Sequence, residues 1–442
     1  MLKNKSLFLY YFLISAYFFA VIATSVGSLL NINIQDFYRI PIIKIKIIDI
    51  AIIFILISFT SKIIRTKIQI NKINKILGLF IILFVFFTLI NLLLTFGKIE
   101  FDAQIGFLLA LLCVVIFYDF QQNLDIKKLS RFVTFIVIAS AFSLLIYNFN
   151  LLAGLYTGTG IAIEKTGGGE RLLFINIGMK ETIGTLPLIS IVLFGTLNFS
   201  DLKIKYKNFY FIIMIISTLS LFISLIFSFH RGMLFTILLT FLYDLFFYKG
   251  KFKSQIFVKI AIVSFLFLIV IYIFENILYL KGFKPIQNLI DTFYYAIDIE
   301  NPEWDKGRSI SRALALQVWS NNLLIGIGLV YLDKYTGMYQ LATAHNFFIT
   351  SLLHNGIIGT FLYVSIFLVV YYCLYKLFKV RNQLKIYNLS FIANLIIISG
   401  ITWLIPFLVQ EVIFERYSLS FQYVILSISI FLYNFIKTSN KP

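Results

Sequence analysis

Long apolar segments recur along the whole chain, and their length limits the fold more than any other feature. A run of about 18 or more apolar residues is long enough to cross a hydrocarbon core. Only helices and closed barrels span lipid, because every backbone polar group must be paired there. A barrel strand alternates polar and apolar residues over about 10 positions, whereas these runs are apolar all round. The sequence therefore predicts an all-α polytopic membrane protein.

The composition supports this class. Hydrophobic residues make up 60% of the chain and charged residues 13%, against about 25% charged in a soluble domain. Cys113 and Cys373 both lie inside apolar runs, and no CxxC pair or His/Cys cluster predicts a disulfide framework or a metal site. No cofactor is predicted. The basic start, Met1–Lys5, precedes an apolar run that is too long for a cleaved signal, so we expect this run to be the first span.

About 12 transmembrane helices account for the apolar runs. We place them near 7–30, 47–62, 76–96, 103–118, 132–150, 174–197, 208–229, 232–248, 255–275, 346–375, 387–408 and 417–436. Two connecting segments are long: 151–173, which is rich in glycine, and 276–345. We interpret both as extracytoplasmic loops of a single transmembrane domain, 1–442. The stretch Ser309–Asn321 is expected to form short amphipathic helices at the membrane surface.

The net charge of +18 is distributed unevenly between the connecting segments. Lysine and arginine gather in every second one, for example Lys62–Lys75 and Lys376–Lys385. The positive-inside rule places such segments in the cytoplasm, which puts both termini there. The excess charge therefore indicates orientation in the membrane and requires no nucleic-acid partner.

Most arginines depart from this distribution and fall on the predicted outer side: Arg39, Arg171, Arg231, Arg308, Arg312 and Arg416. The planar guanidinium group binds phosphate bidentately and stays charged in a dry site. An excess of arginine outside therefore indicates a phosphate-bearing ligand on that face.

Arg231 and Arg171 are the first candidates for this ligand. Arg231 stands in Phe229-His230-Arg231-Gly232, almost without a loop between two spans. A charge so close to the hydrocarbon is costly unless it faces a cavity or a partner; His230 is a candidate support for it. The alternative is an interfacial arginine that snorkels to the surface. Arg171 ends the glycine-rich stretch, and a local ion pair with Glu170 is its alternative role.

Arg308 and Arg312 lie four residues apart in the large loop. A helix would place both on one face, and ion pairs with the nearby Glu303 and Asp305 are the alternative.

His345 stands where the large loop meets the tenth predicted span. A lone interfacial histidine is often structural, but this one lies on the same predicted side as the arginines, and Asn346 is a candidate to orient its ring. Gly356 and Gly359 follow and allow close helix packing. Because imidazole titrates near neutral pH, His345 is a candidate general base. We interpret His354, further along, as a packing or hydrogen-bonding residue.

Taken in order, these motifs resemble the O-antigen ligase and polymerase superfamily over roughly residues 165–375. The family's HN-x(n)-GxxG signature is similar to His345-Asn346 followed by Gly356-Ile357-Ile358-Gly359. Its GR and GvG segment is similar to Gly307-Arg308 and Gly326-Ile327-Gly328. Phe229-His230-Arg231-Gly232 resembles its SRG element, and Arg171 stands where the family has a further arginine.

The chain departs from this pattern at three positions. His230 stands where the family usually has serine, Leu323 where it has proline, and His354 where an acidic residue is common. These changes affect local geometry and leave the arginines and His345 in place.

The resemblance implies a C-type-like glycosyltransferase of the bacterial inner (cytoplasmic) membrane that needs no metal. The expected donor and acceptor are glycans on undecaprenyl pyrophosphate, reached through the membrane lipid. Arg171, Arg231 and Arg308, with Arg312 as a reserve for Arg308, are expected to hold the pyrophosphate. His345 is expected to take the proton from the acceptor hydroxyl, with inversion at the anomeric carbon.

Three functions remain open from the sequence. A polymerase joins repeat units of O-antigen or a related surface polysaccharide, and a chain-length regulator is then a candidate partner. A ligase moves the finished glycan to lipid A core. A polysaccharide flippase is the alternative of another class, although such transporters favour internal repeats and charges at the membrane midplane. We favour the polymerase, because the motifs are degenerate and polymerases vary most in sequence.

Overall fold

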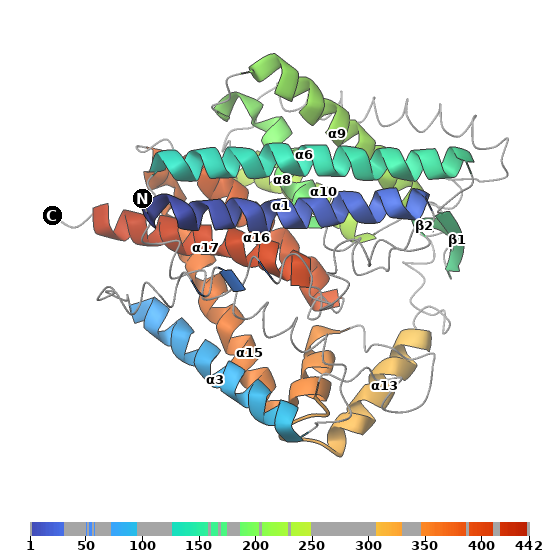
Figure 1. The fold of residues 1–442 in the computed structure, drawn as a ribbon, viewed down its shortest axis with the longest axis vertical. Coiled ribbons are helices and arrows are strands. Elements are labelled where there is room, and N and C mark those ends of the chain that lie inside the picture. Colours follow the sequence, from blue (N-terminus) through green and yellow to red (C-terminus); the bar gives the residue numbers. More distant parts are fainter. Residues whose placement is uncertain are drawn as a thin grey trace. The chain divides into compact units, whose positions relative to one another are not determined.

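The computed structural model describes residues 2–30, 50, 53–54, 57, 72–94, 126–157, 161–166, 169–174, 186–202, 206–228, 231–248, 306–328, 346–385, 389–409 and 416–439. Helices make up almost all of this part of the chain, and one two-stranded hairpin is the exception (Figure 1). The predicted helical class is therefore confirmed for the described residues. The predicted spans 103–118 and 255–275, and most of 47–62, lie outside the described residues.

Three of the described helices are long and apolar enough to cross a membrane: Phe8–Gly27, Ile126–Leu151 and Phe347–Leu384. They belong to α1 (Leu2–Leu29), α6 (Ile126–Thr157) and α15 (Phe347–Val380). Further apolar helices are α3 (Lys72–Leu94), α8 (Leu186–Leu197), α9 (Lys207–Ser228), α10 (Arg231–Tyr243), α16 (Ser390–Val409) and α17 (Arg416–Ser439).

The chain divides into two compact units. Unit 1 comprises Met1–Tyr17, Tyr38–Phe132 and Gly307–Pro442, and unit 2 comprises Phe18–Phe37 and Val133–Lys306.

In unit 1, α15 reverses direction at Gly356, whose φ of 60° and ψ of −167° lie outside the helical region. Thr360 Oγ1 donates to Ser351 Oγ at 3.1 Å across the reversal, and the rings of Phe347 and Phe367 lie 6.0 Å apart. Twenty residues of straight helix would separate those rings by about 30 Å. The span predicted at 346–375 is therefore not one straight helix: α15 is a helical hairpin with a short first arm, Phe347–Asn355, and a longer second arm, Ile357–Val380.

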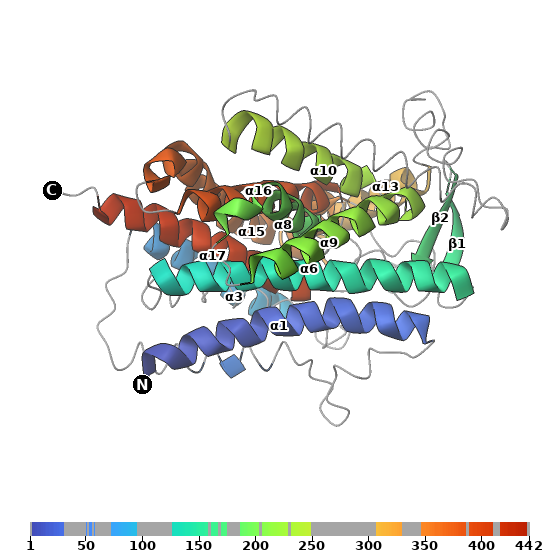
Figure 2. The same cartoon turned by 90° about the horizontal axis from the view of Figure 1, so that it is seen from above.

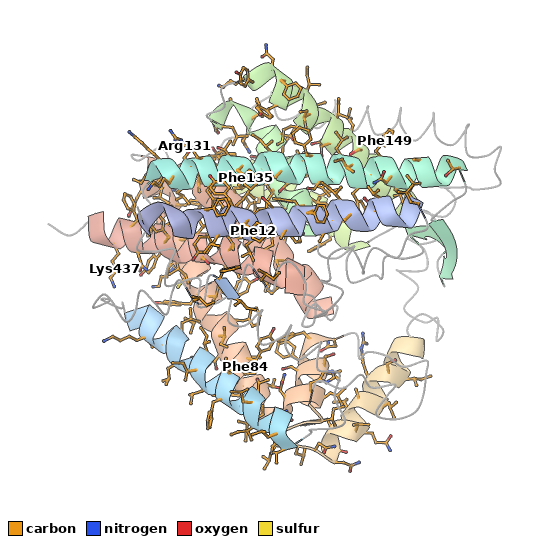
Figure 3. The ribbon with its side chains drawn as sticks, viewed as in Figure 1. Phe12, Phe84, Arg131, Phe135, Phe149 and Lys437 are labelled. Atoms are coloured by element: carbon orange, nitrogen blue, oxygen red, sulfur yellow. The ribbon has the colours of Figure 1, made fainter. Side chains whose placement is uncertain are left out.

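Aromatic rings pack the second arm of α15 between its neighbours. Phe84 of α3 stacks on Tyr363, with ring centroids 5.2 Å apart, and Phe367 stacks on Trp403 of α16 at 5.7 Å. Figure 3 shows Phe84 on the side of α3 that faces α15. Phe87, three residues after Phe84, lies beside Gly359, four residues before Tyr363. Because residue numbers rise along α3 while they fall along α15, α3 runs antiparallel to the second arm. The lysine-rich start of α3 and the lysine-rich end of α15 therefore lie at one end of unit 1.

In unit 2, buried polar side chains join α6 to α9. Ser217 Oγ donates to the carbonyl oxygen of Ala141 at 2.9 Å, and Asn148 Nδ2 donates to Ser220 Oγ at 2.9 Å. Such pairs satisfy polar groups within apolar helices and hold them together. Because both residue numbers rise together along these contacts, α6 and α9 run in the same direction and end at the same end of the unit.

A β-hairpin occupies most of the segment that was predicted as the loop 151–173. The helix α6 continues to Thr157, and β1 (Ile161–Thr166) then pairs antiparallel with β2 (Gly169–Phe174). In the register of the two strands, Thr166 pairs with Gly169 and Ile161 pairs with Phe174. The start of the predicted span 174–197 is also wrong, because Phe174 ends β2 and α8 begins at Leu186.

A buried hydrogen bond links α8 to the end of α10 and allows a stability prediction. Asn198 follows α8, and Asp244 opens the π-helix Asp244–Tyr248 that continues α10. Both side chains are buried, and Asn198 Nδ2 donates to Asp244 Oδ1 at 2.6 Å. We expect Asn198→Leu to lower the free energy of unfolding by about 1.5–3 kcal/mol, the range for a hydrogen bond to a charged group. Denaturation with SDS measures this change.

The Asp244→Leu background is the control for this prediction. Without the carboxylate, Asn198→Leu should cost clearly less free energy. An equal cost in both backgrounds would show that the hydrogen bond contributes nothing.

Candidate functional site

The first arm of α15 carries α13 (Lys306–Ser320) on an apolar face. Ala315 and Val318 of α13 form a buried cluster with Ile327 and Leu353, and Ser311, one turn before Ala315, is also buried. Positions 311, 315 and 318 follow helical spacing, so one stripe of α13 faces the hairpin. A helix at Ser309–Asn321 was predicted and is confirmed, and its position at a membrane surface stays a prediction.

The segment Asn322–Gly328 completes the backbone hydrogen bonds at the reversal. In an unbroken helix, the carbonyl groups of residues 353 and 354 would accept from the N–H groups of 357 and 358. Here the carbonyl oxygens of Leu353 and His354 accept from Ile327 N at 2.8 Å and Gly328 N at 3.1 Å. The N–H groups of Ile357 and Ile358 donate to the carbonyl oxygens of Leu323 and Leu324 at 2.9 and 3.3 Å. The inserted segment thus supplies partners for these four backbone groups.

Glycine is required where these two segments meet. Gly326, Gly328 and Gly356 have φ values of 76°, 77° and 60°, in the region that only glycine adopts readily. A Cβ atom on Gly326 would lie 2.6 Å from the main chain of His354, and one on Gly356 would lie 2.3 Å from that of Leu324. These glycines therefore allow the main chain of Asn322–Gly328 to pack directly against the main chain of α15 at the reversal.

Two polar side chains secure the same contact. His354 is buried, and its Nδ1 lies 2.7 Å from the carbonyl oxygen of Gly328, so Nδ1 carries the proton and donates it. This confirms the hydrogen-bonding interpretation of His354. Asn91 of α3 donates from Nδ2 to the carbonyl oxygens of Ile325 at 3.0 Å and His354 at 3.2 Å. The role of Asn91 was missed, although a lone Asn in an apolar span is itself a signal.

The predicted site residues of unit 1 lie on the two elements that this contact joins. Arg308 is the third residue of α13, and Arg312 stands one turn later and is half-buried. Asn346 is the N-cap of α15, and its Oδ1 accepts from Phe348 N at 3.0 Å and Ile349 N at 3.2 Å. That oxygen is committed to the cap, so a role for Asn346 in orienting His345 stays a prediction. His345 precedes Asn346 and lies outside the described residues.

The predicted site residues of unit 2 belong to neighbouring elements. Arg171 lies in β2, which packs against α9, and Arg231 is the first residue of α10, which follows α9 closely. Figure 2 shows the hairpin at the end of α6 where α9 also ends. In the strand register Arg171 is opposite Glu164, and Glu170 is opposite Lys165. His230 lies outside the described residues.

Each of three helices begins with a motif residue. Arg231 opens α10, Lys306 and Arg308 lie in the first turn of α13, and Asn346 caps α15, with no acidic residue in the first turn of any of the three. A helix N-terminus carries partial positive charge, so cations there oppose helix stability. The same combination of backbone N–H groups and guanidinium groups suits a phosphate. Among the described residues, no three His, Cys, Asp or Glu side chains group as metal ligands.

Residues 212–364 match the family model described as O-antigen ligase. This match supports the resemblance of the chain to the O-antigen ligase and polymerase superfamily. The matched segment starts in α9, contains Arg231, Arg308, Arg312 and His345, and ends eight residues after the reversal of α15. Arg171 lies outside it. Members of this superfamily are glycosyltransferase-like enzymes, and no curated protein matches the chain.

Proposed function

We propose that this protein polymerises oligosaccharide repeat units carried on undecaprenyl pyrophosphate, at the outer face of the cytoplasmic membrane. The superfamily match supports transfer of a lipid-linked glycan. The observation that carries the proposal is the placement of Arg231 and Arg308 in the first turns of α10 and α13. A cation in the first turn weakens a helix. An anionic ligand bound at these helix starts would explain why arginines are present there.

The proposed reaction is an inverting, metal-independent glycosyl transfer. A hydroxyl oxygen of the acceptor sugar attacks the anomeric carbon of the donor, and the bond from that carbon to the pyrophosphate oxygen breaks. The leaving pyrophosphate keeps the electron pair, and Arg171, Arg231 and Arg308 stabilise its growing charge. His345 takes the proton of the attacking hydroxyl. Arg312 stands one helical turn after Arg308 and supports the same charge.

The reversal of α15 supplies the rigidity that such a reaction needs. It joins the helix with Arg308 to the helix that His345 precedes, through paired backbone groups and close glycine contacts. Groups that hold reacting atoms need geometry accurate to about 1 Å or better.

An O-antigen ligase is the second proposed function, since the matched family bears that description. The arginines and His345 would act on the donor in the same way, and lipid A core would replace the lipid-linked acceptor. For a polymerase, a chain-length regulator is the proposed partner. The match to the O-antigen ligase family model favours glycan transfer over the flippase.

The decisive experiment supplies purified protein with the lipid-linked repeat unit and separates the products on a gel. A ladder of lengths is expected from a polymerase. A single shifted product, formed only when lipid A core is added, would instead identify the ligase. Translocation across vesicles without any covalent product would overturn both.

Arg231→Lys tests how the donor is held. We expect a loss of chain formation of about 10-fold or more, because an ammonium group does not reproduce the bidentate fork of a guanidinium group. The initial rate of ladder formation measures the effect. An Arg231→Lys variant with the full rate would show that a point charge is sufficient at this position.

A further inference from the structure

We propose that Asn91 is a positioning residue for glycosyl transfer, which rests on the function proposed above. Its side chain would anchor the α13 segment and the α15 hairpin to α3, and so hold Arg308 and the start of α15 in a fixed relation to the membrane-spanning core of unit 1.

Asn91 joins three segments that are far apart in the chain. Its side chain is 4% exposed, and Nδ2 donates to Ile325 at a sequence separation of 234 residues and to His354 at 263. A carboxamide nitrogen carries two hydrogens, and these two bonds use both. One carboxamide group therefore holds the inserted segment and the hairpin at the same point of α3.

The need to pair the carbonyl group of His354 does not by itself explain why an Asn stands at position 91. The carbonyl oxygen of His354 already accepts from Gly328 N at 3.1 Å, so the bond from Asn91 is a second one. The residues around Asn91, namely Leu89, Ile90, Leu93 and Leu94, are apolar and exposed, as expected for a helix that faces lipid. A polar side chain in such a helix is costly and is usually functional.

The anchor reaches the proposed catalytic groups through rigid elements. Ile325 lies five residues after the end of α13, and His354 lies in the first arm of α15, eight residues after its N-cap Asn346. Loss of the anchor would let both elements shift together relative to α3, without removing any group that touches the substrate. A displacement of about 1 Å at reacting groups costs about 100-fold in rate.

Asn91→Leu is the main test, measured as initial rates of glycan transfer over a range of donor concentrations. We expect kcat to fall about 10- to 100-fold, with KM within about 3-fold of the wild-type value. Thr88→Val is the matched control. Thr88 is also buried on α3, one turn earlier, but its Oγ1 donates to Phe84 of its own helix at 2.8 Å. Its kcat should stay within about 2-fold.

Two further measurements keep the proposal open to refutation. Asn91→Gln retains the two donors on a longer stem and should recover part of the lost kcat, which also serves if Asn91→Leu fails to fold. Hydrogen exchange of residues 322–328 and 353–358 should quicken in Asn91→Leu and not in Thr88→Val.

Three results would overturn the proposed role of Asn91. These are a wild-type kcat in Asn91→Leu, an equal loss of kcat in Asn91→Leu and Thr88→Val, or unchanged hydrogen exchange in both segments. Absence of product from the wild-type protein would instead reject the proposed function, and the exchange data would still report on the anchor.

Discussion

Gly356→Ala is expected to destabilise the protein more than any other single change proposed for it. The new Cβ would lie 2.3 Å from the carbonyl carbon and oxygen of Leu324, and the backbone at φ 60° excludes side chains. Backbone strain costs about 1–3 kcal/mol, and overpacking costs about 1–3 kcal/mol more. Because the atoms in the way belong to a main chain, they have little freedom to move aside. Thermal melting after detergent extraction measures the loss.

Gly400→Ala in α16 provides the matched control. Its Cβ would meet a side-chain end, Leu374 Cδ2 at 2.8 Å, which can rotate, and alanine favours a helix by about 1 kcal/mol over glycine. We therefore expect a melting temperature close to that of the wild type for Gly400→Ala and a strongly lowered one for Gly356→Ala. Equal melting temperatures for the two variants would contradict the reversal of α15.

Arg231→Ala and His345→Ala are expected to abolish chain formation. Removal of one group that stabilises developing charge costs about 100- to 1,000-fold in rate, and removal of a general base costs about 100- to 10,000-fold. The gel ladder from lipid-linked repeat units measures both. His345→Gln, which keeps a polar side chain but no base, should be equally inactive.

Stability separates a functional role of Arg231 from a structural one. A cation at the start of α10 opposes the helix dipole, so Arg231→Ala should leave the protein equally stable or more stable by about 0.3–1 kcal/mol. An inactive variant with undiminished stability is the signature of a residue retained for function.

Arg131→Ala is the control for this substitution. Arg131 lies near the start of α6, exposed and on the predicted cytoplasmic side (Figure 3), and its loss should leave the ladder intact. Full activity of Arg231→Ala, or lost abundance of that variant in the membrane, would reject the proposed role of Arg231.

The long helices were predictable because lipid leaves the backbone few choices. An apolar run in a bilayer must pair its own N–H and C=O groups locally, so α1, α3, α6, α16 and α17 follow from run length alone. Their ends were less accurate. The helix α6 extends beyond 150 to Thr157, and the apolar end of β2 at Phe174 was mistaken for the start of a span.

The motif residues were also found by chemistry, but their arrangement was not. An arginine near the hydrocarbon and a lone histidine at the end of a span can be recognised from the sequence alone. That Arg231 and Arg308 lie in the first turns of helices is known only from the structure. Whether Arg171 and Arg231 converge with Arg308 and His345 stays a prediction. Asn91 was overlooked, because its two partners lie more than 200 residues away.

The sequence by itself indicated the helical membrane class, the candidate phosphate-binding arginines and the resemblance to the superfamily. Only the tertiary structure revealed that α15 turns back at Gly356. Hydropathy reports whether each residue is apolar and contains no information on the direction of the chain. A straight span and a helical hairpin made of the same residues therefore have the same hydropathy profile. The reversal is accompanied by tertiary contacts of Asn322–Gly328, whose backbone groups pair with those of residues 353, 354, 357 and 358.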